Sequence, residues 1–283
     1  MDVYLKPKPK TYTAAPLPFM GQKRRFLKQF KGCLKEQFPD AKLFVDLFGG
    51  SGLLSHTIKR NRPAARVIYN DFDNFCKRIE NIPITNKLLS ELREITKNYP
   101  KDVRLDEFAK KKILEVVFHY DQHYYVDYIT ISSNLLFSMK YVLNYQDLTK
   151  QTFYNCIRLS DYNAAGYLDG LEVVSEDYTN IFDKFKDEPG VVFIVDPPYL
   201  STECSVYDNY WKLKDYLNVL RVLKGTSYIY FTSNKSSIIE LCEWIDQNKD
   251  FENPFVNASR DQMINRVAIN TVFTDIMMYR KAA

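Results

Sequence analysis

Short apolar runs, separated by polar and helix-patterned stretches, dominate the chain. Residues 43–48, 66–69, 172–174 and 191–195 are mostly apolar, and a polar turn and an amphipathic stretch follow them. Buried parallel strands have this largely unbroken apolar character, because helices cover both faces of their sheet. A further strand is expected in SYIYFTS, before Asn234, and two strand-like segments near the end of the chain predict a terminal β-hairpin. The pattern predicts an α/β fold built on an open, largely parallel sheet.

Between residues 84 and 170 the strand pattern gives way to helices. NKLLSELREITKNY and DEFAKKKILEVV alternate charged and apolar residues with helical spacing. Residues 132–145, SSNLLFSMKYVLNY, predict a mostly buried helix. We expect residues 1–83 and 171–283 to form one domain, with residues 84–170 inserted as a mainly helical lobe.

Composition narrows the class of protein only a little. The 283 residues are 46% hydrophobic, enough for a substantial core, and the net charge of +4 permits a nucleic-acid partner without demanding one. Five cysteines without a CxxC pair argue for reduced thiols and a cytoplasmic location. No apolar run approaches membrane-spanning length, and the N-terminus lacks a signal-peptide core. We expect a soluble, cytoplasmic protein.

A glycine-rich turn joins the first predicted strand to a helix that begins near Leu53. In FVDLFGGSG, the glycines at 49, 50 and 52 allow a ligand to approach the backbone closely. Asp71 ends the second strand, where dinucleotide-type folds carry the acid that binds a ribose diol. A nicotinamide enzyme would use this arrangement, but Ser55 replaces the third glycine of its fingerprint. A cofactor with a ribose and an amino-acid tail but no phosphate, such as S-adenosylmethionine, fits better.

Residues 191–200, VVFIVDPPYL, place an acid, two prolines and a tyrosine at the end of a buried strand. Two prolines keep the backbone stiff, so the Asp196 carboxylate, the Pro197 carbonyl and the Tyr199 ring are expected side by side. This trio suits methyl transfer to the exocyclic amino group of a flat base. Both oxygens would accept its N–H groups and free the delocalised lone pair, while Tyr199 stacks on the ring. The alternative is a strand end with an ordinary turn and a packed tyrosine.

Residues 16–35 predict an extended segment, a turn at Gly21 and an amphipathic helix. Six basic residues surround the apolar stripe of this helix: Lys23, Arg24, Arg25, Lys28, Lys31 and Lys35. Such a charged face is more often merely solvated, and direct contact with nucleic-acid phosphates is the alternative.

Three weaker features leave two interpretations each. Asp177 follows a short strand and either binds the adenine of a cofactor or caps the next helix. His119 and His123 have helical spacing, but no third ligand is evident, so a structural role is favoured over a metal site. Packing between helices is favoured over base stacking for the nearby tyrosines, which are Tyr120, Tyr124, Tyr125 and Tyr128.

Taken together and in order, these motifs resemble the α-group, Dam-like (D12 class) family of DNA adenine-N6 methyltransferases. PFMGQK resembles the family's FxGxK segment, FVDLFGGSG its glycine motif, YNDFD its ribose-binding acid and SEDY its acid-aromatic pair. The resemblance implies a Rossmann-like S-adenosylmethionine-dependent methyltransferase sheet as the catalytic domain, with residues 84–170 as an inserted target-recognition domain. The cofactor-binding residues that it implies are Phe19, Gly21, Lys23, Asp46, Phe48, Gly49, Gly50, Gly52, Asp71, Asp177 and Tyr178.

DPPY completes the resemblance and implies the catalytic residues Asp196, Pro197, Pro198 and Tyr199. The expected substrate is a flipped adenine in double-stranded DNA, methylated at N6 without a metal, and a cognate restriction endonuclease is a further partner compatible with the family. An RNA adenine methyltransferase would share every catalytic residue. A catalytically silent nucleic-acid-binding protein and cytosine-N4 transfer are further alternatives. The intact motif set argues against the former, and the aspartate and the motif order favour adenine over cytosine.

Overall fold

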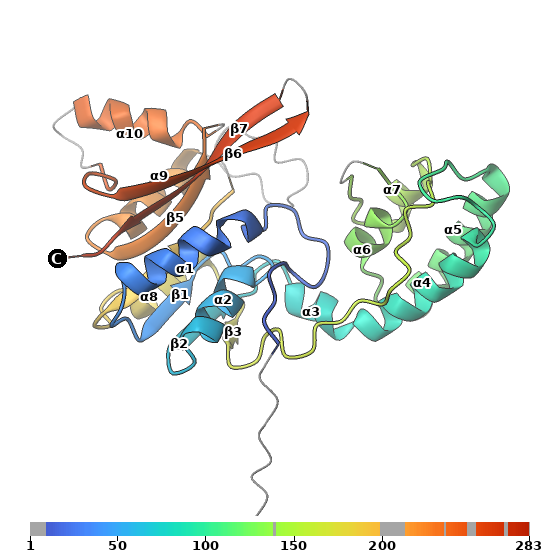
Figure 1. The fold of residues 1–283 in the computed structure, drawn as a ribbon, viewed down its shortest axis with the longest axis horizontal. Coiled ribbons are helices and arrows are strands. Elements are labelled where there is room, and N and C mark those ends of the chain that lie inside the picture. Colours follow the sequence, from blue (N-terminus) through green and yellow to red (C-terminus); the bar gives the residue numbers. More distant parts are fainter. Residues whose placement is uncertain are drawn as a thin grey trace, which may run out of the picture. The chain divides into compact units, whose positions relative to one another are not determined.

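The computed structural model describes residues 10–137, 140–198, 213–234, 236–247, 253–268 and 271–282. The chain divides into two compact units (Figure 1). We call residues 11–13, 23–73 and those from 168 onward the sheet unit, and residues 14–22 and 74–167 the helical unit. Tyr199, expected to stack on the target base, lies outside the described residues.

A seven-stranded sheet with the order β3-β2-β1-β4-β5-β7-β6 organises the sheet unit. Neighbouring strands from β3 to β5 are parallel, whereas β7 runs antiparallel to both β5 and β6. This confirms the α/β sheet and its terminal hairpin. The strands are β1 (Leu43–Asp46), β2 (Arg66–Asn70), β3 (Glu172–Val174), β4 (Val191–Val195), β5 (Ser227–Ser233), β6 (Ser259–Ala268) and β7 (Thr271–Arg280).

Helices cover both faces of this sheet, which explains why its central strands are apolar throughout. Phe44 and Ile194 face a core shared with η1 (Arg24–Phe26), α1 (Leu27–Glu36) and α2 (Leu53–Asn61). Val45 and Phe193 face the opposite core, shared with α8 (Tyr178–Phe185), α9 (Leu213–Leu223) and α10 (Ile238–Gln247). All residues of β4 are buried, as a central parallel strand requires.

The helical unit contains α3 (Phe75–Glu80), α4 (Ile82–Thr96), α5 (Glu107–His123), α6 (Tyr128–Ser133) and α7 (Tyr145–Thr149). The two helices expected at its start are confirmed as α4 and α5, which pack on each other. A buried ion pair between Arg78 Nε and Asp127 Oδ2, 3.0 Å apart, ties α3 to the start of α6. None of the helices in the described part of the chain is long and apolar enough to cross a membrane.

The helix expected over residues 132–145 is wrong. Helix α6 ends at Ser133, and α7 begins only at Tyr145. Polar side chains explain the break, because they bond the backbone outside a helical ladder. The Asn134 amide donates to the Thr130 carbonyl at 2.8 Å, the Ser132 hydroxyl accepts from the backbone N–H of Val142 at 3.2 Å, and Asn144 caps α7.

Candidate functional site

The carboxyl ends of the parallel strands carry a set of polar side chains to one edge of the sheet unit. Strands β1 and β4 are paired so that Asp46 lies opposite Ile194, and Asp196 follows two residues beyond. Asp71 follows β2, whose Tyr69 is the partner of Asp46 on the other side. Open α/β sheets bind their ligands at this edge.

An ion pair joins the first and the last of the sequence motifs within this unit. Lys23 Nζ lies 2.5 Å from Asp196 Oδ2, with only 9% and 17% of the two side chains exposed. Burial raises the pKa of the Asp196 carboxyl, and the nearby Lys23 ammonium partly offsets that rise. The sequence did not reveal this pairing, because Lys23 was expected to contact the cofactor or, as part of a basic helix face, solvent or nucleic-acid phosphates.

Asp46 supplies a second buried carboxyl beside this pair. Ser55 Oγ donates to Asp46 Oδ2 at 2.6 Å, so the residue that breaks the dinucleotide fingerprint has a hydrogen-bonding role. The other oxygen, Oδ1, is buried and has no hydrogen-bond partner among the described residues. Burial raises the pKa of Asp46 to about 7, despite the Ser55 hydrogen bond, and the negative charge of Asp196 contributes to the rise. An ammonium group placed here would satisfy the unpartnered oxygen and favour the ionised carboxylate.

The glycines of the turn after β1 fit closely around Tyr69. A Cβ atom on Gly49 would lie 2.3 Å from the Tyr69 ring and 2.7 Å from the Asn70 carbonyl oxygen, so only glycine fits. The Tyr69 hydroxyl donates to the Gly50 carbonyl at 2.7 Å and also lies 3.1 Å from Asp71 Oδ1. Gly52 has φ of 71° where it precedes α2. These glycines therefore admit the ring that fixes the turn relative to Asp71.

Asn70 is a second residue whose place in the site the sequence did not reveal. Its amide donates to the carbonyls of Leu47 at 2.9 Å and Glu176 at 3.0 Å, and its oxygen accepts from the Glu176 N–H at 3.2 Å. This buried side chain links the segments that leave β1 and β3. Its position inside the motif YNDFD, next to Asp71, was the only available signal.

The segment after β3 contains Asp177 and Tyr178, two of the expected cofactor residues. Asp177 Oδ1 accepts from the Thr179 N–H at 2.8 Å, so Asp177 caps α8, as one of its two interpretations held. The Tyr178 ring lies 4.8 Å from the Phe48 ring. Phe72, directly after Asp71, is 51% exposed although it is aromatic, and its place in the motif YNDFD did not indicate this exposure.

Two expected cofactor residues, Phe19 and Gly21, belong to the helical unit. The Phe19 ring packs edge-on against Phe75, with centroids 5.6 Å apart, and Gly21 has φ of 83°. The Arg78 guanidinium donates to the Pro18 carbonyl at 2.7 Å and holds this segment on the helices.

The tyrosines and histidines at the end of α5 have mixed environments. Tyr120 and Tyr128 are buried between helices, as expected, whereas Tyr124 is 52% exposed. His119 and His123 share one face of α5, with ring centroids 4.6 Å apart. Within the described residues, no group of three or more histidine, cysteine or acidic side chains is arranged to hold a metal ion.

Two comparisons with known proteins indicate the family of this chain. The sequence model of the D12 class N6 adenine-specific DNA methyltransferases matches residues 19–248. A protein of Haemophilus influenzae named "Putative methyltransferase" is 37% identical over 283 aligned residues, which cover 96% of this chain and 93% of that protein. The sheet, with its antiparallel terminal hairpin, is consistent with the fold of this family.

Proposed function

Because the chain belongs to the D12 class N6 adenine-specific DNA methyltransferase family, we propose that it transfers a methyl group from S-adenosylmethionine to N6 of a flipped adenine in double-stranded DNA. One observation carries the proposal most directly. The largely buried Lys23–Asp196 pair lies beside Asp46, whose Oδ1 is buried and has no hydrogen-bond partner among the described residues. At this edge of the sheet, Asp196 would accept a hydrogen bond from a neutral amine, and Asp46 would accept one from an ammonium group.

Asp196 and Pro197 would act on the target base. The Asp196 carboxylate and the Pro197 carbonyl accept the two N–H groups of the adenine amine, which frees its lone pair and stabilises the positive charge that develops on nitrogen. Tyr199 is assigned to stacking on the base by resemblance alone, as it lies outside the described residues. Pro198 keeps the segment stiff.

Lys23 has a role in this scheme beyond the expected cofactor contact. A carboxyl in a buried site favours its protonated form, which accepts hydrogen bonds poorly. The Lys23 ammonium opposes that tendency at Asp196. We assign to Lys23 the task of holding Asp196 ionised until the target amine arrives.

The residues at the edge suit S-adenosylmethionine. Asp46 would receive its ammonium group, Asp71 its ribose, and the turn at Gly49, Gly50 and Gly52 would lie against its amino-acid end. Phe48, Asp177 and Tyr178 would surround its adenine. Bound here, the cofactor supplies an electrophilic methyl group, and holding both reactants in one site provides proximity.

The remaining assignments rest on the resemblance. Phe19 and Gly21, in the segment similar to FxGxK, are proposed as further cofactor contacts. Residues 84–170 are proposed as the target-recognition domain.

Two aspartate variants test this division of roles. Asp196→Ala should abolish methyl transfer and leave S-adenosylmethionine binding nearly intact. Asp71→Ala should have its main effect on cofactor affinity, which should fall. Isothermal titration calorimetry with the cofactor and a methyl-transfer assay on DNA separate the two effects. Asp187→Ala, an exposed site on the sheet unit, is the control for loss of one negative charge. Turnover by Asp196→Ala comparable to that of the unchanged protein would refute the assignment.

A further inference from the structure

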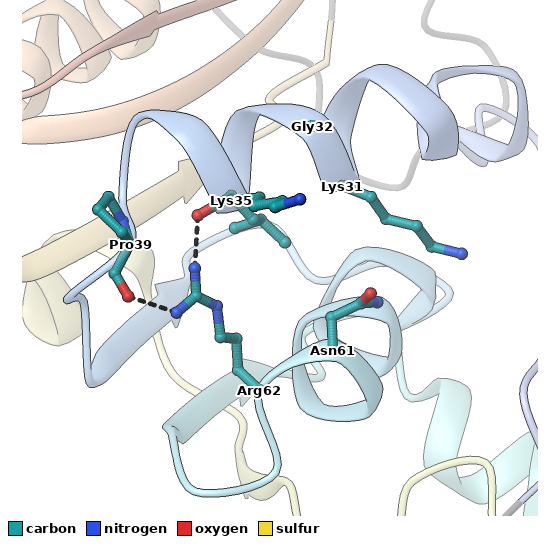
Figure 2. Close-up of a pocket in the computed structure, with 7 residues that line it drawn as sticks. Lys31, Gly32, Lys35, Pro39, Asn61 and Arg62 are labelled. Atoms are coloured by element: carbon teal, nitrogen blue, oxygen red, sulfur yellow. Dashed lines mark hydrogen bonds between the residues drawn. The ribbon is translucent and has the colours of Figure 1, made fainter.

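The outer surface of α1 and α2 contains a basic hollow that the proposed reaction does not use. Its volume is about 580 Å³, and its lining includes Lys31, Gly32 and Lys35 from α1 and Asn61 and Arg62 from the end of α2 (Figure 2). We call it the basic groove. No acidic residue lines it.

The groove lies away from the proposed catalytic edge. Lys23 and Gly52 precede α1 and α2 at that edge, while the groove lies toward the carboxyl ends of both helices. A ten-residue helix such as α1 is about 15 Å long. The groove is therefore a separate surface of the same unit.

The basic residues of the groove are not ion-paired within the described part of the chain. Among the ion pairs of the described residues, none includes Lys31, Lys35 or Arg62. Neutral carbonyls hold the Arg62 guanidinium, which donates to Leu34 at 2.7 Å and to Pro39 (Figure 2). It also donates to the Phe38 carbonyl at 3.3 Å. These bonds fix the guanidinium without neutralising it.

Gly32 leaves open space in the lining of the basic groove. It lies in the interior of α1, where glycine is a poor helix former, and its φ is not positive. A Cβ atom there would meet nothing within 4 Å, so packing does not demand glycine either. Lysines near a helix carboxyl end also offset the helix dipole, but that role does not account for the open space above Gly32.

We propose that the basic groove binds phosphate groups of the nucleic-acid strand that flanks the target base. Lys31 and Lys35 would contact the phosphates directly, Arg62 would add a fixed positive charge, and Gly32 would let the sugar-phosphate backbone approach the helix. Phosphate contacts of this kind position a protein on a duplex without reading its sequence. The proposal rests on the nucleic-acid substrate of the proposed function.

The test measures binding of a labelled DNA duplex by fluorescence anisotropy over about 50–200 mM salt, without cofactor. A plot of log affinity against log salt concentration has a negative slope. Each lost phosphate contact makes this slope shallower by about 0.9. In the double variant Lys31→Gln and Lys35→Gln, the slope should therefore be shallower by about 1.8. Its affinity near 0.15 M salt should be roughly 30-fold lower. Gly32→Ala should weaken binding without changing the slope, since it removes no charge.

A matched control removes the same charge from the opposite face of the sheet. Lys184→Gln with Lys186→Gln, at α8, should keep the slope of the unchanged protein. An unchanged slope in the Lys31 and Lys35 variant would overturn the proposal, as would an equal loss in the control. Competition by polyglutamate but not by DNA or RNA at the groove would overturn it in favour of an acidic protein partner.

The two proposals can fail separately. Normal DNA methylation with an unaltered salt slope in the groove variant would refute only the groove. If the groove variant has a shallower slope but the unchanged protein methylates no nucleic acid, only the proposed reaction is refuted.

Discussion

Lys23 and Asp196 form a largely buried ion pair, with Nζ 2.5 Å from Oδ2, although they lie 173 positions apart in the chain. The pair joins the turn before α1 to the end of β4. A protein that uses Asp196 as a hydrogen-bond acceptor must keep it ionised in a place where burial favours its protonated form. The cation that meets this need comes from the segment similar to FxGxK, which the sequence had not linked to Asp196.

Replacing Lys23 should move the pH dependence of methyl transfer. Lys23→Gln retains a hydrogen-bond donor but loses the charge that lowers the pKa of Asp196. The pKa of Asp196 should rise, so the acidic limb of the rate profile should shift upward by about 1–3 pH units. Initial rates of methyl transfer across pH measure the shift, with Lys184→Gln as the charge control. An acidic limb that stays in place would show that Lys23 does not act through Asp196.

Asp46 should make the free protein less stable as pH rises. Its pKa is raised from 3.8 to about 7 in the folded state, so between these values the folded protein keeps a proton that the unfolded chain releases. The free energy of unfolding should therefore fall over about pH 4–7, by at most about 1.4 kcal/mol per pH unit. Urea denaturation at pH 5 and pH 8 should show a larger fall in the unchanged protein than in Asp46→Asn. Equal pH dependence in the two proteins would contradict the raised pKa.

Asn70 should act as a positioning residue for the cofactor site. Asn70→Ala removes three hydrogen bonds to the segments after β1 and β3, at a cost of about 2–3 kcal/mol in unfolding free energy, and should weaken S-adenosylmethionine binding more than it lowers the maximal rate. Asn86 offers a matched control, since its amide bonds both the N–H and the carbonyl of Tyr162 in the helical unit. Calorimetry should show that Asn86→Ala loses stability but keeps its cofactor affinity. Equal losses of cofactor affinity in both variants would show that Asn70 only stabilises the fold and does not position the cofactor site.

The two glycines with contrasting surroundings should respond oppositely to alanine. Gly49→Ala places a methyl group 2.3 Å from the Tyr69 ring and should destabilise the fold by about 1–3 kcal/mol. Gly32→Ala meets nothing within 4 Å in a helix and should stabilise the fold by about 0.5–1 kcal/mol. Thermal unfolding of both variants provides the comparison. A Gly49→Ala protein as stable as the unchanged one would show that the turn does not need the close contact with Tyr69.

The sequence predicted the regular elements well where apolar periodicity sets them. The strand expected over Glu172–Val174, the helix starting at Leu53 and the terminal hairpin all appear in the structure. The pattern failed over residues 132–145, where side chains such as Asn134 bond the backbone and end the helix. Hydrophobic spacing carries no information about such local hydrogen bonds.

The candidate site was predictable in its motifs but not in its contacts. Strand order brings Asp46, Asp71 and Asp196 to one edge, as the sequence indicated. The pairing of Lys23 with Asp196 depends on where η1 begins relative to β4, which only the packed structure defines. The fit of Tyr69 against Gly49 likewise depends on the distance between two adjacent strands.

The most direct test of the central claim is mass spectrometry of nucleosides after the purified protein and S-adenosylmethionine are incubated with unmethylated DNA and, separately, with RNA. The account predicts N6-methyldeoxyadenosine from DNA, and its absence when Asp196→Ala is used. Methylation of RNA alone, or of cytosine, would contradict the proposed substrate while leaving the fold and the cofactor site in place. No methylated nucleoside from either nucleic acid, in a protein shown to bind the cofactor, would contradict the proposed reaction itself.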